Sequence, residues 1–282
     1  MQSDRDGSST EVTWEGLAVT YRQVAQGLCR LGLGPGDRIG ILSENRPEWV
    51  YADLAIYAAK GIVVPIHCTL TPAHICNILD DCAAKAVFVS NARLLEGLLG
   101  IRGKLPYLKT VIIFDPPSND LPQDILPLQA LIDLGGEVSR GARDNVEGCE
   151  AVGQGSDVAT IIYTSGTMGE SKGVVLTHDN LLSNLKGIKK SIAITDSDSC
   201  VSLLPLSHIF ERSALYLLLY SGARIHYARS PDVVVNKISE VRPTILFSVP
   251  RFYEKVFARL QEQMTEGPTV PGSWRSHRFP DC

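Results

Sequence analysis

The sequence lacks several features that mark common classes of protein. No apolar run approaches the ~20 residues that a membrane-spanning helix requires, and the longest candidate, residues 215–220, is better read as a buried helix. The first nine residues contain no apolar core of a signal peptide. The formal charge of −4 shows no excess of basic residues that would bind the phosphates of a nucleic acid. We therefore expect a cytoplasmic protein with no nucleic-acid partner.

Cysteine pairs with metal-site spacing are also absent. The seven cysteines include no C-x-x-C pair, and their odd number leaves at least one thiol unpaired within the chain. We expect reduced thiols. A metal-site interpretation exists for His67, Cys68, His74, Cys76 and Cys82, but their spacing matches no zinc template and cysteine is commonly a small buried apolar residue.

Strand-like and helix-like segments alternate through much of the chain. The predicted strands include residues 37–42, 62–66, 86–89 and 110–114, and the predicted helices include residues 45–60 and 71–82. Asn45 and Thr71 are the expected N-caps of these helices. Such alternation favours parallel strands joined by helical crossovers. The predicted fold class is α/β, with mostly parallel sheets and flanking helices.

Residues 163–173, Y-T-S-G-T-M-G-E-S-K-G, gather hydroxyl groups, glycines and a lysine between two apolar runs that read as strands. Glycines let backbone N–H groups approach an anion, hydroxyls donate to phosphate oxygens, and Lys172 adds positive charge. The spacing differs from that of P-loop ATPases, because Gly173 follows Lys172. A surface hairpin is the alternative, but turn chemistry alone does not require these donors. We predict a phosphate-binding loop.

This loop resembles the phosphate-binding signature of AMP-forming adenylating enzymes, whose usual form is Y-T-S-G-T-T-G-x-P-K-G. Met168 stands where the family has a second threonine, and Ser171 where it has proline. Residues 203–212, L-L-P-L-S-H-I-F-E-R, and residues 248–256 resemble segments of the long-chain fatty acid–CoA ligase (acyl-CoA synthetase) subgroup. Segments near residues 34–39, 45–49 and 63–66 resemble the amino-terminal part of the same ligases.

The resemblance implies a partial AMP-binding (adenylation) domain over residues 17–264, with two subdomains and a loop-rich connection at residues 115–156. Residues 1–16 are expected to form a flexible segment, and residues 265–282 an unstructured tail outside the family. Family motifs for adenine, ribose and the adenylation lysine find no match here. We therefore expect a carboxy-terminally truncated ligase with an incomplete fold, inactive or weakly active alone.

The implied reaction activates a fatty acid with ATP to acyl-AMP and pyrophosphate, and then forms the acyl-CoA thioester. ATP, Mg²⁺ and coenzyme A are the implied cofactors and co-substrates. Lys172 and His208 are the implied catalytic residues, and Thr164 the implied magnesium ligand. The residues implied to bind ATP are Thr164, Ser165, Gly166, Thr167, Met168, Gly169, Glu170, Lys172 and Gly173.

Several alternatives stay open at this point. His208 is alternatively a hydrogen-bonded histidine at a strand end, and Glu211 and Arg212 are alternatively a local ion pair. The chain is alternatively an enzyme that adenylates another carboxylic acid, or a noncatalytic module that binds nucleotide or acyl chains. Peripheral membrane contact and a homo-oligomer also stay open.

Overall fold

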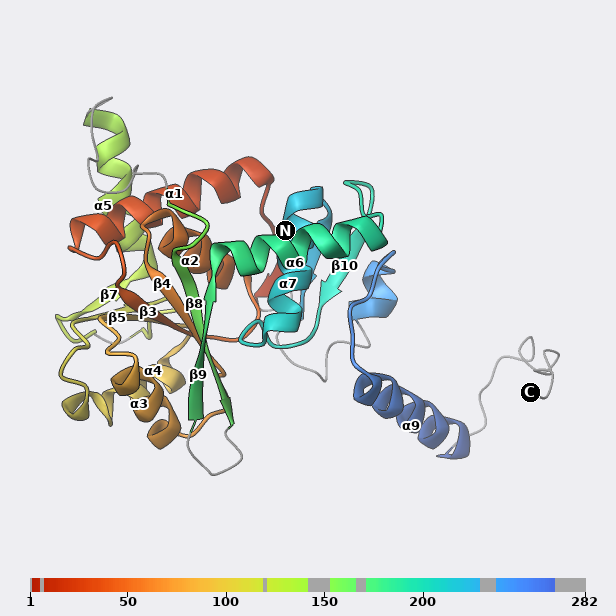
Figure 1. Ribbon diagram of the computed structural model, residues 1–282. Coiled ribbons are helices and arrows are strands. Elements are labelled where there is room, and N and C mark those ends of the chain that lie inside the picture. Colours follow the sequence, from red (N-terminus) through yellow and green to blue (C-terminus); the bar gives the residue numbers. More distant parts are fainter. Residues whose placement is uncertain are drawn as a thin grey trace. The chain divides into compact units, whose positions relative to one another are not determined.

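A seven-stranded sheet organises the larger part of the molecule (Figure 1). The computed structural model describes residues 2–5, 8–118, 121–141, 153–165, 171–228 and 237–266. The strands lie in the order β7 (Ile125–Pro127), β6 (Thr110–Ile113), β5 (Ala86–Val89), β3 (Arg38–Leu42), β4 (Ile62–Ile66), β8 (Val158–Ser165) and β9 (Ser171–Thr177). Among these described strands, β8 and β9 pair antiparallel and all other neighbours pair parallel. The predicted α/β class with mostly parallel sheets is confirmed.

A second sheet has four strands. Their order is β10 (Ser199–Ser202), β11 (Arg224–Tyr227), β1 (Gln2–Arg5) and β2 (Ser8–Glu11). Residues 1–16, which the sequence predicts as flexible, thus contain two strands, because β11 offers β1 a partner that only the folded chain supplies. Both sheets belong to one compact unit, residues 1–247, and residues 248–282 form a second unit that contains helix α9 (Pro250–Glu266).

Helices cover both faces of the seven-stranded sheet (Figure 1). Helices α1 (Trp14–Arg30), α2 (Pro47–Ala58) and α5 (Leu128–Gly141) lie on one face, and α3 (Pro72–Asp81) and α4 (Ala92–Leu99) on the other. A 3₁₀ turn at Arg102–Lys104 follows α4. Helix α6 (His178–Ser191) follows β9, and α7 (Ile209–Ser221) connects β10 to β11. None of the described helices is long and apolar enough to cross a membrane.

Alternate side chains of the central strands enter two different cores. In β5, Ala86 and Phe88 join the core beneath α1 and α2, whereas Val87 and Val89 join the core beneath α3 and α4. All four side chains are buried. A parallel strand with helices on both faces must be apolar at every position, which is why these strands appear in the sequence as short continuous apolar runs.

The predicted loop-rich connection at residues 115–156 is wrong for the segment that forms β7 and α5. Gly135 reads as a turn signal in the sequence, but it lies where α5 packs on α1. A Cβ atom at Gly135 would stand 1.8 Å from the backbone oxygen of Gln23, and one at Gly27 would stand 2.5 Å from that of Leu131. These glycines therefore allow two helices to approach closely instead of forming a turn.

Replacing Gly135 with alanine should lower the free energy of unfolding by about 1 to 3 kcal/mol, because the added methyl group has no room against α1. Gly187 of α6 is the matched control, since no described atom beyond the adjoining turns of its own helix lies within 4 Å of a Cβ built there. Gly187→Ala should leave the stability unchanged or raise it by up to about 1 kcal/mol through helix propensity. Urea unfolding compares the two, and equal effects would contradict the proposed packing.

The expectation of reduced cysteine thiols is confirmed for some of the cysteines. Cys68, Cys76, Cys82 and Cys200 are free thiols, which confirms the expectation for these four. Cys29 is disulfide-bonded, so the expectation is wrong for that residue. An odd number of cysteines excludes complete pairing, but it carries no information on which thiols approach one another in the fold.

Candidate functional site

The predicted phosphate-binding residues fall at the end of the β8–β9 hairpin that adjoins the connecting residues 166–170. Thr164 and Ser165 end β8, and Lys172 lies directly opposite Thr164 on β9. Opposed residues of an antiparallel pair place their side chains on the same face of the sheet, so Thr164 and Lys172 project from the same side of the hairpin. Both residues are exposed, and no acid among the described residues pairs with Lys172. The predicted residues that lie outside the described part are Gly166, Thr167, Met168, Gly169 and Glu170.

Tyr163 and Gly173 form the next pair of the hairpin. The Tyr163 hydroxyl donates a hydrogen bond to Asp81 at the end of α3, which ties β8 to a helix of the sheet. A Cβ atom at Gly173 would stand 2.8 Å from Ile161 Cγ2 and 3.2 Å from the Tyr163 ring. Glycine at position 173 thus leaves room for the tyrosine that ties this end of the hairpin to α3.

An apolar cavity of about 760 Å³ lies on the hairpin face that carries Thr164. Ile162, Thr164 and Val174 line it from the hairpin, and helices α6 and α7 supply most of the remaining wall. Phe210 and Phe247 are the aromatic side chains of the lining. This volume lies in the range of small-molecule sites, and it adjoins the threonine of the phosphate-binding signature.

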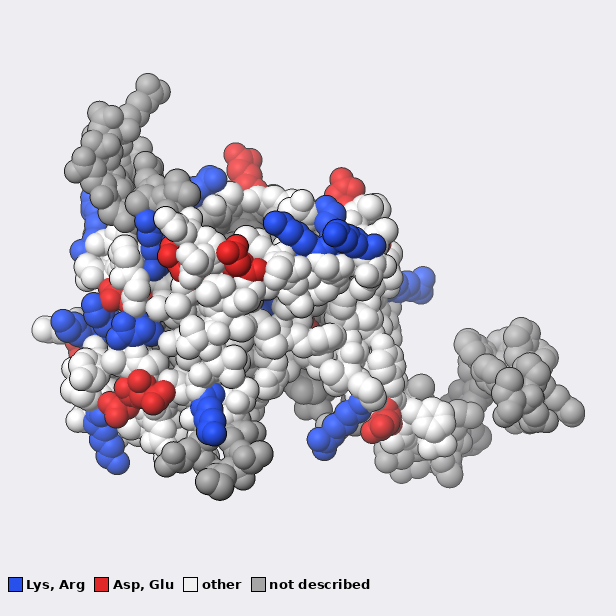
Figure 2. Space-filling model, in the orientation of Figure 1, with Lys and Arg blue, Asp and Glu red and all other residues white. Residues whose placement is uncertain are grey.

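Charged side chains are sparse across the middle of the face on which α6 and β9 lie (Figure 2). Val174 and Val175 of β9 are exposed there, with relative accessibilities of 44% and 54%, and Leu182 of α6 is exposed as well. Basic side chains are found instead at the carboxyl end of α6, at Lys189 and Lys190. The surface around the hairpin therefore suits an apolar ligand better than a charged macromolecule.

His208 is the N-cap residue of α7, directly before cavity residues Ile209 and Phe210. Its ring centroid lies 5.6 Å from that of His67, which follows β4. Burial, with a contribution from His208, lowers the pKa of His67. The sequence pattern drew attention to His67 only as a metal ligand, because nothing in the linear order indicates that the β4 end and the start of α7 meet.

No group of three or more histidine, cysteine or acidic side chains in the described part of the chain is arranged to hold a metal ion. The ring nitrogens Nδ1 of His67 and His74 instead contact the hydroxyl groups of Thr69 and Thr71, at 2.7 and 2.8 Å. Thr71 also accepts from the His74 N–H as the N-cap of α3, as predicted from the sequence.

Asn45 holds the loop of residues 203–208, which connects β10 to α7. Its Nδ2 donates to the Leu204 carbonyl at 2.6 Å and to Ser202 Oγ at 3.0 Å, and its Oδ1 accepts from the Leu206 N–H at 3.0 Å. The prediction that Asn45 caps α2 is wrong, since Arg46 is the N-cap residue. Because the side chain is committed to a distant loop, it is not available to its own helix.

Arg212 forms a fully buried ion pair with Asp53 of α2, with 2.7 Å between Nη2 and Oδ1. Its guanidinium also donates to Thr160 Oγ1 in β8 at 3.0 Å, to the Tyr57 hydroxyl and to the Tyr216 hydroxyl. Burial disfavours the charged guanidinium, yet Asp53 and the tyrosines raise the pKa of Arg212 above its usual value. This network joins α7, α2 and the strand that carries Thr164.

Glu211 does not pair with its neighbour Arg212, so the local ion pair considered from the sequence is wrong. Its side chain is buried and accepts a hydrogen bond from Ser202 Oγ at 2.6 Å. Burial raises the pKa of Glu211 to about 7, although hydrogen bonds from Ser202 and from the backbone of Leu203 and Leu204 act in the opposite direction. Adjacent residues of a helix point in different directions, which explains why the two charges find separate partners.

The stability of the chain should depend on pH through Glu211. The pKa is about 7 in the folded chain against an ordinary 4.5, so the folded chain binds more protons between these values and the free energy of unfolding falls as the pH rises across them. Two and a half pKa units correspond to about 3 kcal/mol. Glu211→Gln cannot ionise and should lose this dependence.

Urea unfolding of the wild-type chain and of Glu211→Gln at pH 4.5 and pH 8 measures this effect. The stability of the variant relative to the wild type should increase by about 3 kcal/mol from the lower to the higher pH. A relative stability that is the same at both pH values would show that the carboxyl group is already ionised near its ordinary pKa in the folded chain.

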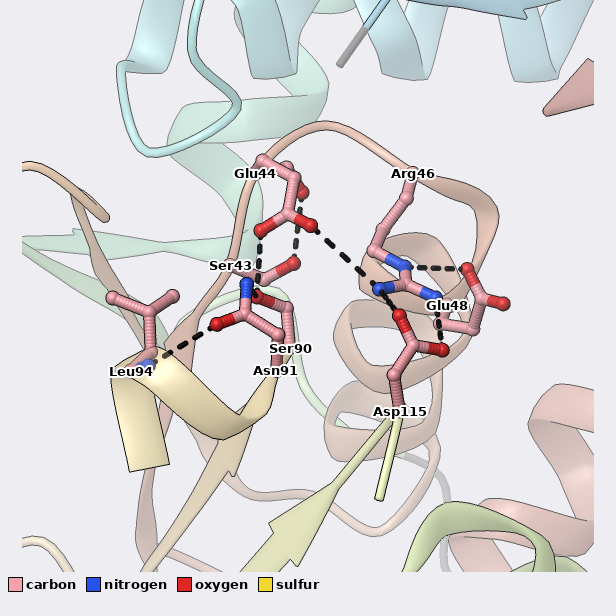
Figure 3. Close-up of polar contacts among 8 residues, drawn as sticks. All are labelled: Ser43, Glu44, Arg46, Glu48, Ser90, Asn91, Leu94 and Asp115. Carbon is pink, nitrogen blue, oxygen red and sulfur yellow. Dashed lines mark hydrogen bonds and ion pairs between the residues drawn. The ribbon is translucent and has the colours of Figure 1, made fainter. Parts of the chain in front are cut away.

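A second polar cluster occupies the carboxyl ends of β3, β5 and β6 (Figure 3). The buried Arg46 guanidinium lies 2.6 Å from Asp115 and 2.8 Å from Glu48. Beside it, Ser90 Oγ donates to Glu44 Oε2 at 2.6 Å. Ligands often bind where the strand order of an open sheet reverses, as it does between β3 and β5. These groups already partner one another, so the cluster fixes the turn that precedes α2.

Comparison with known proteins gives a family for this chain. The family described as AMP-binding enzyme matches residues 3–276. The long-chain-fatty-acid–CoA ligase ACSBG1 of Rattus norvegicus is 34% identical over 250 residues, which cover 86% of this chain and 34% of that relative. The peroxisomal long chain acyl-CoA synthetase 6 of Arabidopsis thaliana is 33% identical over 260 residues, which cover 90% and 36%. The chain thus spans about a third of the length of these curated relatives.

Solved structures share the fold. A long-chain-fatty-acid–CoA ligase (FadD1) from Archaeoglobus fulgidus matches with a TM-score of 0.77 at 22% identity, over 92% of this chain and 50% of that one. The anthranilate CoA ligase AuaEII in complex with anthranoyl-AMP matches with a TM-score of 0.76 at 25% identity, over 89% and 47%.

Proposed function

This chain belongs to the AMP-binding enzyme family, with long-chain acyl-CoA synthetases among its relatives, and on this premise we propose that it binds ATP at the β8–β9 hairpin and activates a fatty acid as an acyl adenylate. The observation that carries the proposal is the position of Thr164. Thr164 lies opposite Lys172 in the hairpin and also lines the apolar cavity. One residue thereby adjoins both a cationic group for phosphate and an apolar space for an acyl chain.

In the proposed reaction, the fatty acid carboxylate attacks the α-phosphate of ATP, and pyrophosphate leaves with the electrons of the broken P–O bond. Negative charge builds up on the phosphate oxygens, and the Lys172 ammonium stabilises it because it is exposed and unpaired among the described residues. The acyl adenylate then reacts with the thiol of coenzyme A, which displaces AMP. The protein mainly positions and neutralises the reacting groups.

Magnesium is part of this proposal, with Thr164 as its protein ligand. A hydroxyl at a strand end suits Mg²⁺, which prefers oxygen ligands and keeps several waters while it is bound to substrate phosphates. When bound, the ion neutralises charge on the pyrophosphate leaving group. The exposure of Thr164 leaves space for such a hydrated ion.

A fatty acid is the proposed substrate because the cavity walls are mainly apolar and because curated relatives are named as long-chain ligases. Another carboxylic acid is the second candidate, since a structural neighbour is named as an anthranilate CoA ligase. A cytoplasmic location is part of this proposal, as expected from the sequence.

Pyrophosphate exchange into ATP tests the proposed reaction. Exchange by this chain alone should be weak, as expected from the sequence. It should depend on palmitate and exceed the exchange with octanoate or benzoate at equal concentration. Higher exchange with benzoate would favour the second candidate. ATP binding without exchange for any acid would contradict the proposed catalysis and would favour a noncatalytic nucleotide-binding module.

A further inference from the structure

The loop of residues 203–208 presents His208 at the start of α7, yet it belongs to neither a helix nor a strand. Backbone groups in such a loop need hydrogen-bond partners from elsewhere when they are buried. Leu206 and Ser207 are buried, with relative accessibilities of 1% and 8%. The conformation of this loop therefore depends on the side chains that satisfy it.

Asn45 supplies these hydrogen-bond partners, although it is distant from the loop in the sequence. A carboxamide is the side chain that donates and accepts at one end, and Asn45 uses both capacities, towards the Leu204 carbonyl and the Leu206 N–H. The backbone next to Asn45 is itself fixed, because Arg46 is buried among acidic partners (Figure 3). Asn45 thus connects a rigid turn of the seven-stranded sheet to the loop that carries His208.

Glu211 holds the same loop from the other side. It lies in the first turn of α7, where an anion is favoured by the helix dipole, and it accepts from Ser202 Oγ. Ser202 Oγ also accepts from Asn45 Nδ2, so the three side chains form one chain of hydrogen bonds. The titratable groups that face Glu211 are Cys200 and Tyr227, and burial raises the pKa of each above its usual value, so both are neutral at pH 8.

We propose that Asn45 and Glu211 are positioning residues that hold the loop of residues 203–208 in the conformation that places His208 beside His67 and the cavity. Neither residue needs to touch a substrate for this role. The relevance of this positioning to acyl activation rests on the proposed function. The positioning itself is a property of the chain without any ligand and is measured separately.

The test is the nuclear Overhauser effect between the rings of His67 and His208 at pH 8, measured on the full chain with labelled histidine. The centroid separation of 5.6 Å should give a cross-peak in the wild type, and the signals are assigned with His67→Gln and His208→Gln. Asn45→Asp, which loses both donors, and Glu211→Ala should each weaken the cross-peak at least about twofold, whereas Glu211→Gln, which retains an acceptor for Ser202, should restore it.

Asn91→Asp is the matched control. Asn91 caps α4 through its Oδ1, which an aspartate retains, and it makes no contact with the loop of residues 203–208. The cross-peak should remain unchanged in this variant. A wild-type cross-peak intensity in both Asn45→Asp and Glu211→Ala would overturn the proposal. If Asn45→Asp does not fold, as judged by thermal unfolding, Glu211→Ala compared with Glu211→Gln decides alone.

Calorimetry on the same variants separates this inference from the proposed function. Asn45→Asp should weaken palmitate binding while leaving ATP binding within about twofold of the wild type, because the hairpin is not part of the loop contacts. If the wild type binds neither ATP nor palmitate but the cross-peak changes as expected, the proposed function is contradicted and the proposed positioning role is supported. If ligand binding is normal and the cross-peak is unchanged in the variants, only the proposed positioning role is contradicted.

Discussion

Arg212→Met should lower the free energy of unfolding by about 3 to 5 kcal/mol, because it leaves the Asp53 carboxylate buried without its cation. Neither side chain of the pair is accessible to solvent. The substitution also removes hydrogen bonds from Arg212 to Thr160 of β8 and to two tyrosine hydroxyls. Urea unfolding at neutral pH measures the effect.

Two control variants make this result interpretable. Arg30→Met removes an ion pair with Glu137 whose partners are 39% and 71% exposed, and it should change the stability by less than about 1 kcal/mol. The double variant Arg212→Met with Asp53→Leu removes both buried charges and should recover part of the loss. A loss in Arg212→Met as small as that in Arg30→Met would contradict the proposed role of the network in joining α7 to the sheet.

Lys172→Ala should weaken ATP binding about 10- to 100-fold, which corresponds to the loss of a charged hydrogen bond of roughly 1.5 to 3 kcal/mol. Lys172 is the cation that the hairpin places opposite Thr164. Since it is exposed, its replacement should leave the folded state intact. Calorimetric titration with ATP and Mg²⁺ measures the affinity.

Lys190→Ala serves as the control for Lys172→Ala. Lys190 is also an exposed lysine, in the last turn of α6, and the same formal charge is lost. The affinity of Lys190→Ala should stay within about twofold of the wild type. Equal weakening in both variants would indicate a general effect of net charge and would remove Lys172 from the proposed site.

The regular elements of the α/β unit were predictable wherever local patterns and tertiary context agree. Apolar runs such as residues 62–66 and 86–89 are buried strands, and Thr71 with Pro72 begins a helix. Helix α5 was not predictable, because Gly135 signals a turn locally and close helix packing only in three dimensions. The same ambiguity affects Asn45, because an asparagine suits an N-cap of its own helix as well as it suits hydrogen bonds to a distant loop.

The candidate site was predictable where its residues are neighbours in the sequence. It was not predictable where residues that are distant in the sequence meet in the fold. The strands that flank the phosphate-binding segment were evident from its apolar neighbours, and the structure adds the register that opposes Thr164 to Lys172. The meeting of His67 with His208 depends on how the β4 end packs near α7, which no local spacing encodes. The roles of the predicted site residues remain predictions until they are measured.

Hydrogen exchange of the full chain with and without ATP and Mg²⁺ tests the central claim most directly, because it locates the bound nucleotide. Our account predicts slower exchange of backbone amides within residues 163–174 on addition of the nucleotide, and loss of this protection in Lys172→Ala. Protection confined to other segments, such as the polar turns after β3 and β5, or no protection at saturating nucleotide, would contradict the assignment of the β8–β9 hairpin as the triphosphate site.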